Sequence, residues 1–297
     1  MILLFDISEC HAHRRITILV YAMRKTRTVQ KIRFGKKSGL HTSFIEQSEL
    51  VQLNPFVQWE HYTAKALVRS KRLDYDSHSG VDAVSYPVVG KLSHHDSTGN
   101  HVTLASGDVH IMTSGDGIIH KEIMTPQNGQ VESFSLGTIL PAGKMEMAPA
   151  SCINLNAQQL PLIEEHDSTT KVIIGRYKDT ASPANYSIPM TFLDIMIAPY
   201  GCWYFEPDPE QSAGFVYLRS GSVYISGSQI HRHQMATLAP SPLPIEVRTS
   251  KLGARIFIVT GKPQQQPLFS NHHSVHSSRQ NMSKATQNID RLLTARK

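Results

Sequence analysis

The chain has 297 residues, of which 40% are hydrophobic and 18% charged, a composition typical of a folded globular protein and not of a disordered one. That length allows about two domains. The formal net charge is +6, but nine basic residues and no acidic residue lie between positions 14 and 37, so the excess charge belongs mainly to one segment. No RNA- or DNA-binding motif accompanies this segment, and we therefore interpret it as a solvated basic stretch and expect no direct nucleic-acid contact.

The cysteine spacing and the lengths of the apolar segments indicate the cellular compartment. Cys10, Cys152 and Cys202 are odd in number and widely spaced, which argues against a disulfide framework and predicts a reducing, cytoplasmic location. No apolar run approaches the ~18 residues that a membrane span requires. We interpret residues 1–22 as an N-terminal extension, because Met23 offers a second plausible start.

The middle of the chain consists of short apolar runs separated by turns rich in Gly, Asp and Asn. Such short and regularly spaced runs are typical of an antiparallel sandwich or a small barrel. The strands predicted in this way cover residues 83–89, 91–95, 101–105, 109–113 and 118–124.

A similar pattern recurs later in the chain. Tyr86-x-x-x-Gly90 is matched by Tyr217-x-x-x-Gly221, which lies 131 residues further on (217 − 86), and each is followed by a short strand, a turn and an apolar strand. Two copies of one β unit indicate a duplicated barrel. The sequence thus predicts an all-β protein with a first barrel in residues 23–145 and a second in residues 146–262.

Residues 263–297 differ in character from the rest of the chain. They are rich in His, Ser and Gln, and Met282 to Leu293 could form a short helix capped by Ser283 or Asn281. We expect a C-terminal arm that ends in this helix, with His276 exposed to solvent.

Two pairs of residues have the spacing of metal ligands on a strand. Asp76 and His78 are two residues apart, as are His120 and Glu122, and residues two apart on a strand point the same way. Two imidazoles and two carboxylates suit a six-coordinate divalent ion, and the nearest chemical analogue is the two-His, one-carboxylate site of non-haem iron. Spacing alone is a weak signal in a chain with 16 histidines. His94 and His95 are adjacent, so they cannot both point into a barrel.

Several segments resemble the pirin family. Residues 76–86, D-S-H-S-G-V-D-A-V-S-Y, are similar to the family pattern H-P-H-R-G-F-E-T-V-T-Y, and residues 107–122, G-D-V-H-I-M-T-S-G-D-G-I-I-H-K-E, resemble G-D-V-Q-W-M-T-A-x-x-G-I-x-H-x-E. Further matches at positions 94–100, 140–142, 215–221 and 260–263 extend the resemblance over roughly residues 50–265, with the matches in the second barrel looser than those between His94 and Glu122.

The resemblance implies a fold and a metal site. Pirins have two cupin barrels (double-stranded β-helices, or jelly rolls), and the metal lies in the N-terminal one. The family's four ligands fall on Asp76, His78, His120 and Glu122; Asp76 stands where the family has His. Fe²⁺ is the implied cofactor, with Mn²⁺, Ni²⁺ or Zn²⁺ as chemically acceptable substitutes. Asp82 would be a spare carboxylate near the site.

The resemblance leaves three functions open. The first is a quercetin-type dioxygenase acting on a flavonol-like aromatic substrate, with Glu122 as the proton acceptor. The second is a non-enzymatic, metal- or redox-dependent regulatory protein that binds a protein partner such as a transcription regulator. The third is a degenerate cupin that has lost its metal, as the Asp76 departure would allow. In each case we expect a monomer.

Overall fold

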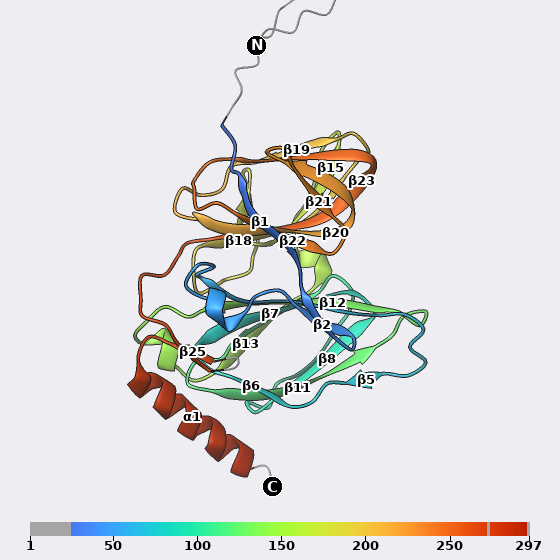
Figure 1. Cartoon of the computed structure of the whole chain (residues 1–297). Helices are drawn as coiled ribbons and strands as arrows, with labels where there is room; N and C mark the ends of the chain where they lie inside the picture. Colours follow the sequence, from blue (N-terminus) through green and yellow to red (C-terminus); the bar gives the residue numbers. More distant parts are fainter. Residues whose placement is uncertain (1–24, 272–273, 296–297) are drawn as a thin grey trace, which may run out of the picture.

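The computed structural model describes residues 25–271 and 274–295, so the expected N-terminal extension lies outside it. Two β bodies are stacked on each other, and helix α1 (Arg279–Thr294) lies against the lower one (Figure 1). Within the described part of the chain, no helix is both long and apolar enough to cross a membrane. The five strands expected in the middle of the chain are confirmed to within two residues: β7 (Val81–Val89), β8 (Lys91–Asp96), β9 (His101–Leu104), β10 (Val109–Thr113) and β11 (Ile118–Thr125).

The lower body, which we call the first barrel, consists of two facing sheets. The seven-stranded sheet has the order β13-β10-β7-β12-β4-β3-β2, and the five-stranded sheet has the order β5-β11-β8-β9 with β6 also paired to β11. The remaining strands of the two sheets are β2 (Lys36–Ser38), β3 (His41–Ser43), β4 (Phe56–Ala64), β5 (Lys71–Arg72), β6 (Asp76–His78), β12 (Val131–Ile139) and β13 (Ser151–Leu155).

The upper body, the second barrel, is one nine-stranded sheet of order β1-β22-β20-β23-β18-β15-β14, with β19 and β21 paired to β23 and β20. Its two longest strands are β20 (Ala213–Ile225) and β23 (Ile245–Gly261). The others are β1 (Val29–Phe34), β14 (Leu162–Glu164), β15 (Ser168–Ile174), β18 (Met190–Ile197), β19 (Cys202–Phe205), β21 (Ser228–His231) and β22 (Gln234–Leu238), and a separate hairpin joins β16 (Arg176–Tyr177) to β17 (Thr180–Ala181).

Two strands pair across the expected domain boundaries. β1, from the start of the chain, pairs with β22 of the second barrel, and β13, which follows residue 145, pairs with β10 of the first. The division at residues 145 and 262 stays a prediction about folding units. β1, which lies in the expected first domain, completes the second barrel, and β13, which lies in the expected second domain, completes the first.

Both copies of the repeated pattern turn at the same kind of residue. Gly90 and Gly221 each have a φ of +86°, a conformation that a residue with a Cβ adopts only with strain. A Cβ on Gly90 would lie 2.5 Å from the carbonyl oxygen of Thr125. The glycine of the Tyr-x-x-x-Gly pattern therefore lets a long strand bend sharply beside its neighbour.

The main apolar cores lie in two places. One fills the space between the barrels, where Trp59 and Phe134 stack at 5.6 Å and meet aromatic side chains of β18, β20 and β23. The other fills the inside of the second barrel with side chains such as Val172, Trp203 and Ile256. Among the residues that the structure describes, the inside of the first barrel contains two small apolar clusters. Its remaining interior is polar.

The expectation that the basic segment is solvated is wrong for Arg27. Its side chain is fully buried and donates from Nε to the carbonyl oxygen of Ala239, at 2.8 Å, and from its terminal nitrogens to those of Gln211 and Ser212. Burial lowers the pKa of Arg27 to about 10. These hydrogen bonds hold the start of the described chain against the second barrel. The number of charges in a segment does not predict that one of them is buried.

The C-terminal arm docks along the first barrel. It forms the hairpin of β24 (Phe269–Asn271) and β25 (Ser274–His276) and then helix α1. The helix begins earlier than expected, because Ser278 is the N-cap and its Oγ accepts a hydrogen bond from the Asn281 N–H. His276, which we expected to be exposed, is fully buried.

Candidate metal centre

The register of the five-stranded sheet places the expected ligands on one face. β11 pairs His120 with Asp76 of β6 on one side, and it pairs Glu122 with His94 of β8 on the other. Directly opposed residues of an antiparallel pair project to the same side of the sheet. Asp76, His78, His120, Glu122 and His94 therefore share the face that looks into the first barrel.

Three of the four expected ligands converge closely. His78 Nε2 lies 3.0 Å from His120 Nε2 and 3.4 Å from Asp76 Oδ2. One donor atom from each of the three lies within 4.8 Å of the other two. Two nitrogens bound at right angles, each about 2.1 Å from one metal ion, stand about 3.0 Å apart. The observed spacing of the two imidazoles thus fits ligands of a single divalent cation.

The fourth expected ligand, Glu122, belongs to an overlapping group. Its donor oxygen lies within 4.8 Å of donor atoms of His94 and His120. Glu122 Oε1 accepts a hydrogen bond of 3.1 Å from Ser85 Oγ and stands 3.6 Å from His94 Nδ1. The structure therefore places the four expected residues, together with His94, in two triplets that share His120.

Burial sets the protonation of these groups. Burial first, and then the neighbouring His78, lower the pKa of His120 to about 4. Burial alone would raise the pKa of Glu122, but its interactions with His94 and His120 outweigh that effect and hold the pKa below its usual range. At neutral pH the site offers an uncharged imidazole and an ionised carboxylate, which are the forms that bind metals.

Two histidines that the sequence did not assign to a site also enter the cavity. His94 and His110 are each 1% exposed, and both line it together with the expected ligands. As the alternation of a strand requires, His95 is not buried. The available signal was the departure at position 110, where the chain has His in place of the Gln of the resemblance.

Asp82 does not lie beside the site. It is fully buried on the opposite face of β7, where its Oδ1 accepts a 2.6 Å hydrogen bond from Thr113 Oγ1 and where it neighbours Ser187 of the second barrel. Because side chains alternate along β7, it is Ala83 and Ser85 that line the cavity. The expected spare carboxylate therefore belongs to the joint between the barrels.

The cavity itself is small. Its volume is about 30 Å³, and it is bounded by Gln58, Tyr62, Met112 and Ser135 besides the residues already named. A space of this size holds an ion and about one water molecule. A hollow of about 1010 Å³ borders the second barrel, but among the described residues every group of candidate metal donors lies in the first.

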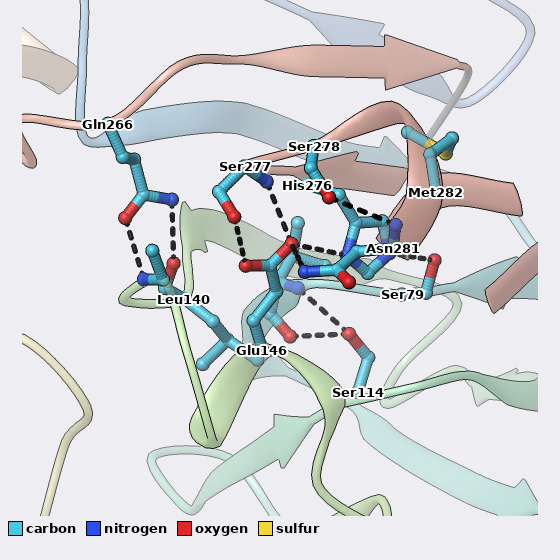
Figure 2. A network of polar contacts seen from close by, with 12 residues as sticks. Ser79, Ser114, Leu140, Glu146, Gln266, His276, Ser277, Ser278, Asn281 and Met282 are labelled. Carbon is cyan, nitrogen blue, oxygen red and sulfur yellow. Dashed lines mark hydrogen bonds and ion pairs between the residues drawn. The ribbon is translucent and has the colours of Figure 1, made fainter. Parts of the chain in front are cut away.

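The strand that carries Asp76 and His78 is supported from outside by the C-terminal arm (Figure 2). Ser79 Oγ lies 2.9 Å from His276 Nε2, and His276 Nδ1 lies 2.8 Å from Glu146 Oε1. Glu146 is fully buried and also accepts hydrogen bonds from Ser277 and Asn281. Ser79 points away from the cavity because it alternates with His78, so this network positions the strand from the side opposite the expected ligands.

Comparison with known proteins places the chain in a family. The Pirin family model matches residues 37–136, which include all four expected ligands. Pirin-1 of Arabidopsis thaliana is 29% identical over 196 residues, covering 64% of this chain and 67% of its own length. The sequence matches, together with the fold, support membership of the pirin family. The resemblance to pirins noted in the sequence is thereby confirmed.

Solved structures support the architecture. The quercetin 2,3-dioxygenase from Acinetobacter baumannii superposes with a TM-score of 0.81 at 20% identity, covering 90% of this chain and 98% of that one. A bacterial pirin from Escherichia coli, solved in complex with nickel(II), has a TM-score of 0.61 at 12% identity, covering 78% of this chain and all of that one. These likenesses concern the fold alone. They confirm the expected all-β architecture with two cupin barrels.

Proposed function

We propose that this protein is a metal-dependent dioxygenase of the quercetin 2,3-dioxygenase type, with its metal held by Asp76, His78, His120 and Glu122. The observation that carries the proposal is the 3.0 Å approach of His78 Nε2 to His120 Nε2 beside the Asp76 carboxylate. Two imidazoles and a carboxylate with room for further ligands suit iron of the non-haem class. The proposal takes Fe²⁺ as the resident ion and the protein as a cytoplasmic monomer.

The side chains have separable tasks in this proposal. When bound, the metal supplies the one-electron and O₂ chemistry that no side chain provides. Glu122 is ionised and lies inside the cavity, so it accepts the hydroxyl proton of a flavonol-like substrate. Ser85 Oγ donates to one oxygen of that carboxylate and thereby fixes its orientation.

A turnover assay on the full chain tests the proposal. Metal is removed with a chelator, Fe²⁺ or Mn²⁺ is restored, and O₂ uptake is followed with quercetin as the substrate. We expect metal-dependent O₂ uptake that falls at least 100-fold in Glu122→Gln, since a general base contributes about 10²–10⁴ in rate. Glu164→Gln, a change at an exposed carboxylate of the second barrel, is the matched control and keeps full activity.

A second function is favoured by the size of the cavity. A volume of about 30 Å³ admits no flavonol unless the walls move. Such a closed site suits a regulatory protein whose metal state alters its binding to a protein partner. Stoichiometric metal binding without O₂ uptake under any metal would favour this alternative over the dioxygenase. A chain that binds no metal at the four residues would be the degenerate cupin.

A further inference from the structure

A second group of donor atoms lies at the edge of the first barrel, beside the site already described. Cys152 is on β13, and the register that pairs it with Met112 and pairs Asn154 with His110 directs both Cys152 and His110 into the barrel. His94 reaches the same place from the five-stranded sheet opposite. One donor atom each from His94, His110 and Cys152 lies within 4.8 Å of the other two.

A carboxylate completes this group. Asp96 Oδ2 lies 3.1 Å from His94 Nε2 and 3.3 Å from Cys152 Sγ, and the Asp96 side chain is fully buried. Zinc binds sulfur at about 2.3 Å and nitrogen or oxygen at about 2.0–2.2 Å, so tetrahedral ligands stand about 3.3–3.6 Å apart. The observed spacing is close to that range before any ion pulls the side chains together.

The same residues are oriented by partners outside the group. The other carboxylate oxygen of Asp96 accepts hydrogen bonds from the N–H and Oγ1 of Thr98, at 2.8 and 2.6 Å. His110 Nδ1 lies 2.7 Å from Asn154 Oδ1 and donates its proton there, since that oxygen can only accept. His110 Nε2 then keeps a lone pair that is buried and has no hydrogen-bond partner in the described chain. Metal ligands are usually held by outer partners of this kind.

We propose that a second cation of the zinc class binds here, between the two sheets of the first barrel, at Cys152, His94, Asp96 and His110. One sulfur, two nitrogens and one oxygen form a closed four-ligand set, which is typical of a structural zinc site. The ion links β8 of one sheet to β10 and β13 of the other. This second site has its own ligands and goes beyond the proposed oxygenase centre.

The proton balance of binding is simple. In the metal-free protein, burial and then the charge of Asp96 raise the pKa of the Cys152 thiol to about 12, so the sulfur carries a proton. Zn²⁺ displaces that proton to the solvent and binds the thiolate. His94 binds the ion through Nε2 and carries its proton on Nδ1, which faces Glu122 Oε1 at 3.6 Å. One proton per ion is released, and no oxidation state changes.

Cobalt(II) tests the proposal because it replaces zinc and reports on sulfur. The full chain is freed of metal, titrated with Co²⁺, and followed for thiolate-to-cobalt charge-transfer absorption in the near ultraviolet. We expect this band to saturate at one Co²⁺ per chain and to disappear in Cys152→Ser, which binds one equivalent less. Cys202→Ser, at an exposed cysteine of the second barrel, is the matched control and keeps the band.

Two further variants separate this site from the proposed oxygenase centre. His120→Ala removes a ligand of the first centre and leaves the charge-transfer band intact. His110→Gln, which restores the residue of the family pattern, weakens Zn²⁺ binding at the second site at least tenfold in a competition titration. No charge-transfer band in the wild-type chain at saturating Co²⁺ overturns the proposal, whatever the variants do. A band that persists in Cys152→Ser overturns it as well.

Discussion

The two barrels repeat one β pattern but fill their interiors differently. The second barrel is packed with apolar side chains, among them Val172, Leu193 and Ile256, which are all fully buried. The first holds a cluster of imidazoles and carboxylates between two small apolar clusters. Apolar packing stabilises a barrel from within and leaves no room for a ligand. The first barrel keeps that room and is stabilised from outside, by the aromatic core between the barrels and by the C-terminal arm.

The largest effect is expected when a carboxylate is placed in the apolar interior of the second barrel. Ile256→Asp should cost more than about 4 kcal/mol, because the new charge is buried with no partner. Urea denaturation and the yield of folded protein measure the effect. Ile256→Val is the matched control and should cost about 1 kcal/mol. A stable Ile256→Asp protein would show that the second barrel also accommodates charge.

The second largest effect is expected from acid, which should lower the free energy of unfolding of the metal-free protein through groups in the first barrel. Burial lowers the pKa of both His110 and His120 from 6.5 to about 4. Between these values the unfolded chain binds protons that the folded chain rejects, so stability is greatest above pH 6.5 and falls as the pH drops toward 4. The loss is on the order of 3 kcal/mol for each histidine.

Urea denaturation of chelator-treated protein at pH 7 and pH 5 measures this loss. His110→Gln removes one of the two groups and should flatten the dependence on pH. A free energy of unfolding that is equal at the two pH values would contradict the account. So would a dependence that His110→Gln leaves unchanged.

The external support of the first barrel can be tested at His276. His276→Ala removes its hydrogen bonds to Ser79 and to the buried Glu146 and should cost about 2 kcal/mol, since hydrogen bonds to charged groups contribute about 1.5–3 kcal/mol. Hydrogen exchange should quicken in β6 and β25 while β20 and β23 of the second barrel keep their protection. His231→Ala, at an exposed histidine, is the control. Equal loss of protection in both barrels would mean that the arm supports the whole molecule.

The smallest expected effect concerns the departure from the family pattern. Asp76→His restores an imidazole at the metal centre and should tighten Ni²⁺ binding about tenfold, because Ni²⁺ is well suited to imidazole, whereas carboxylates suit Mg²⁺, Ca²⁺ and Mn²⁺ better. Isothermal titration calorimetry at one pH compares the two proteins. Asp76→Asn keeps the shape without the charge and should weaken binding. Unchanged affinity in both variants would place Asp76 outside the metal's coordination.

The sequence by itself determined the strands, the duplication and the inward pairs of the first barrel. Gly90 and Gly221 mark the turns, and alternation places Asp76 with His78 and His120 with Glu122. These features are local: a positive φ requires glycine, and residues two apart on a strand always share a face.

Only the tertiary structure decided which of those faces look into a cavity. Alternation along β7 separates Asp82 from Ser85 but does not say that Asp82 faces the second barrel. His94, His110 and Cys152 come from three strands in two sheets, so their meeting depends on how the sheets are stacked. The burial of His276 depends on a chain terminus that returns across the molecule, and no local pattern encodes such a contact.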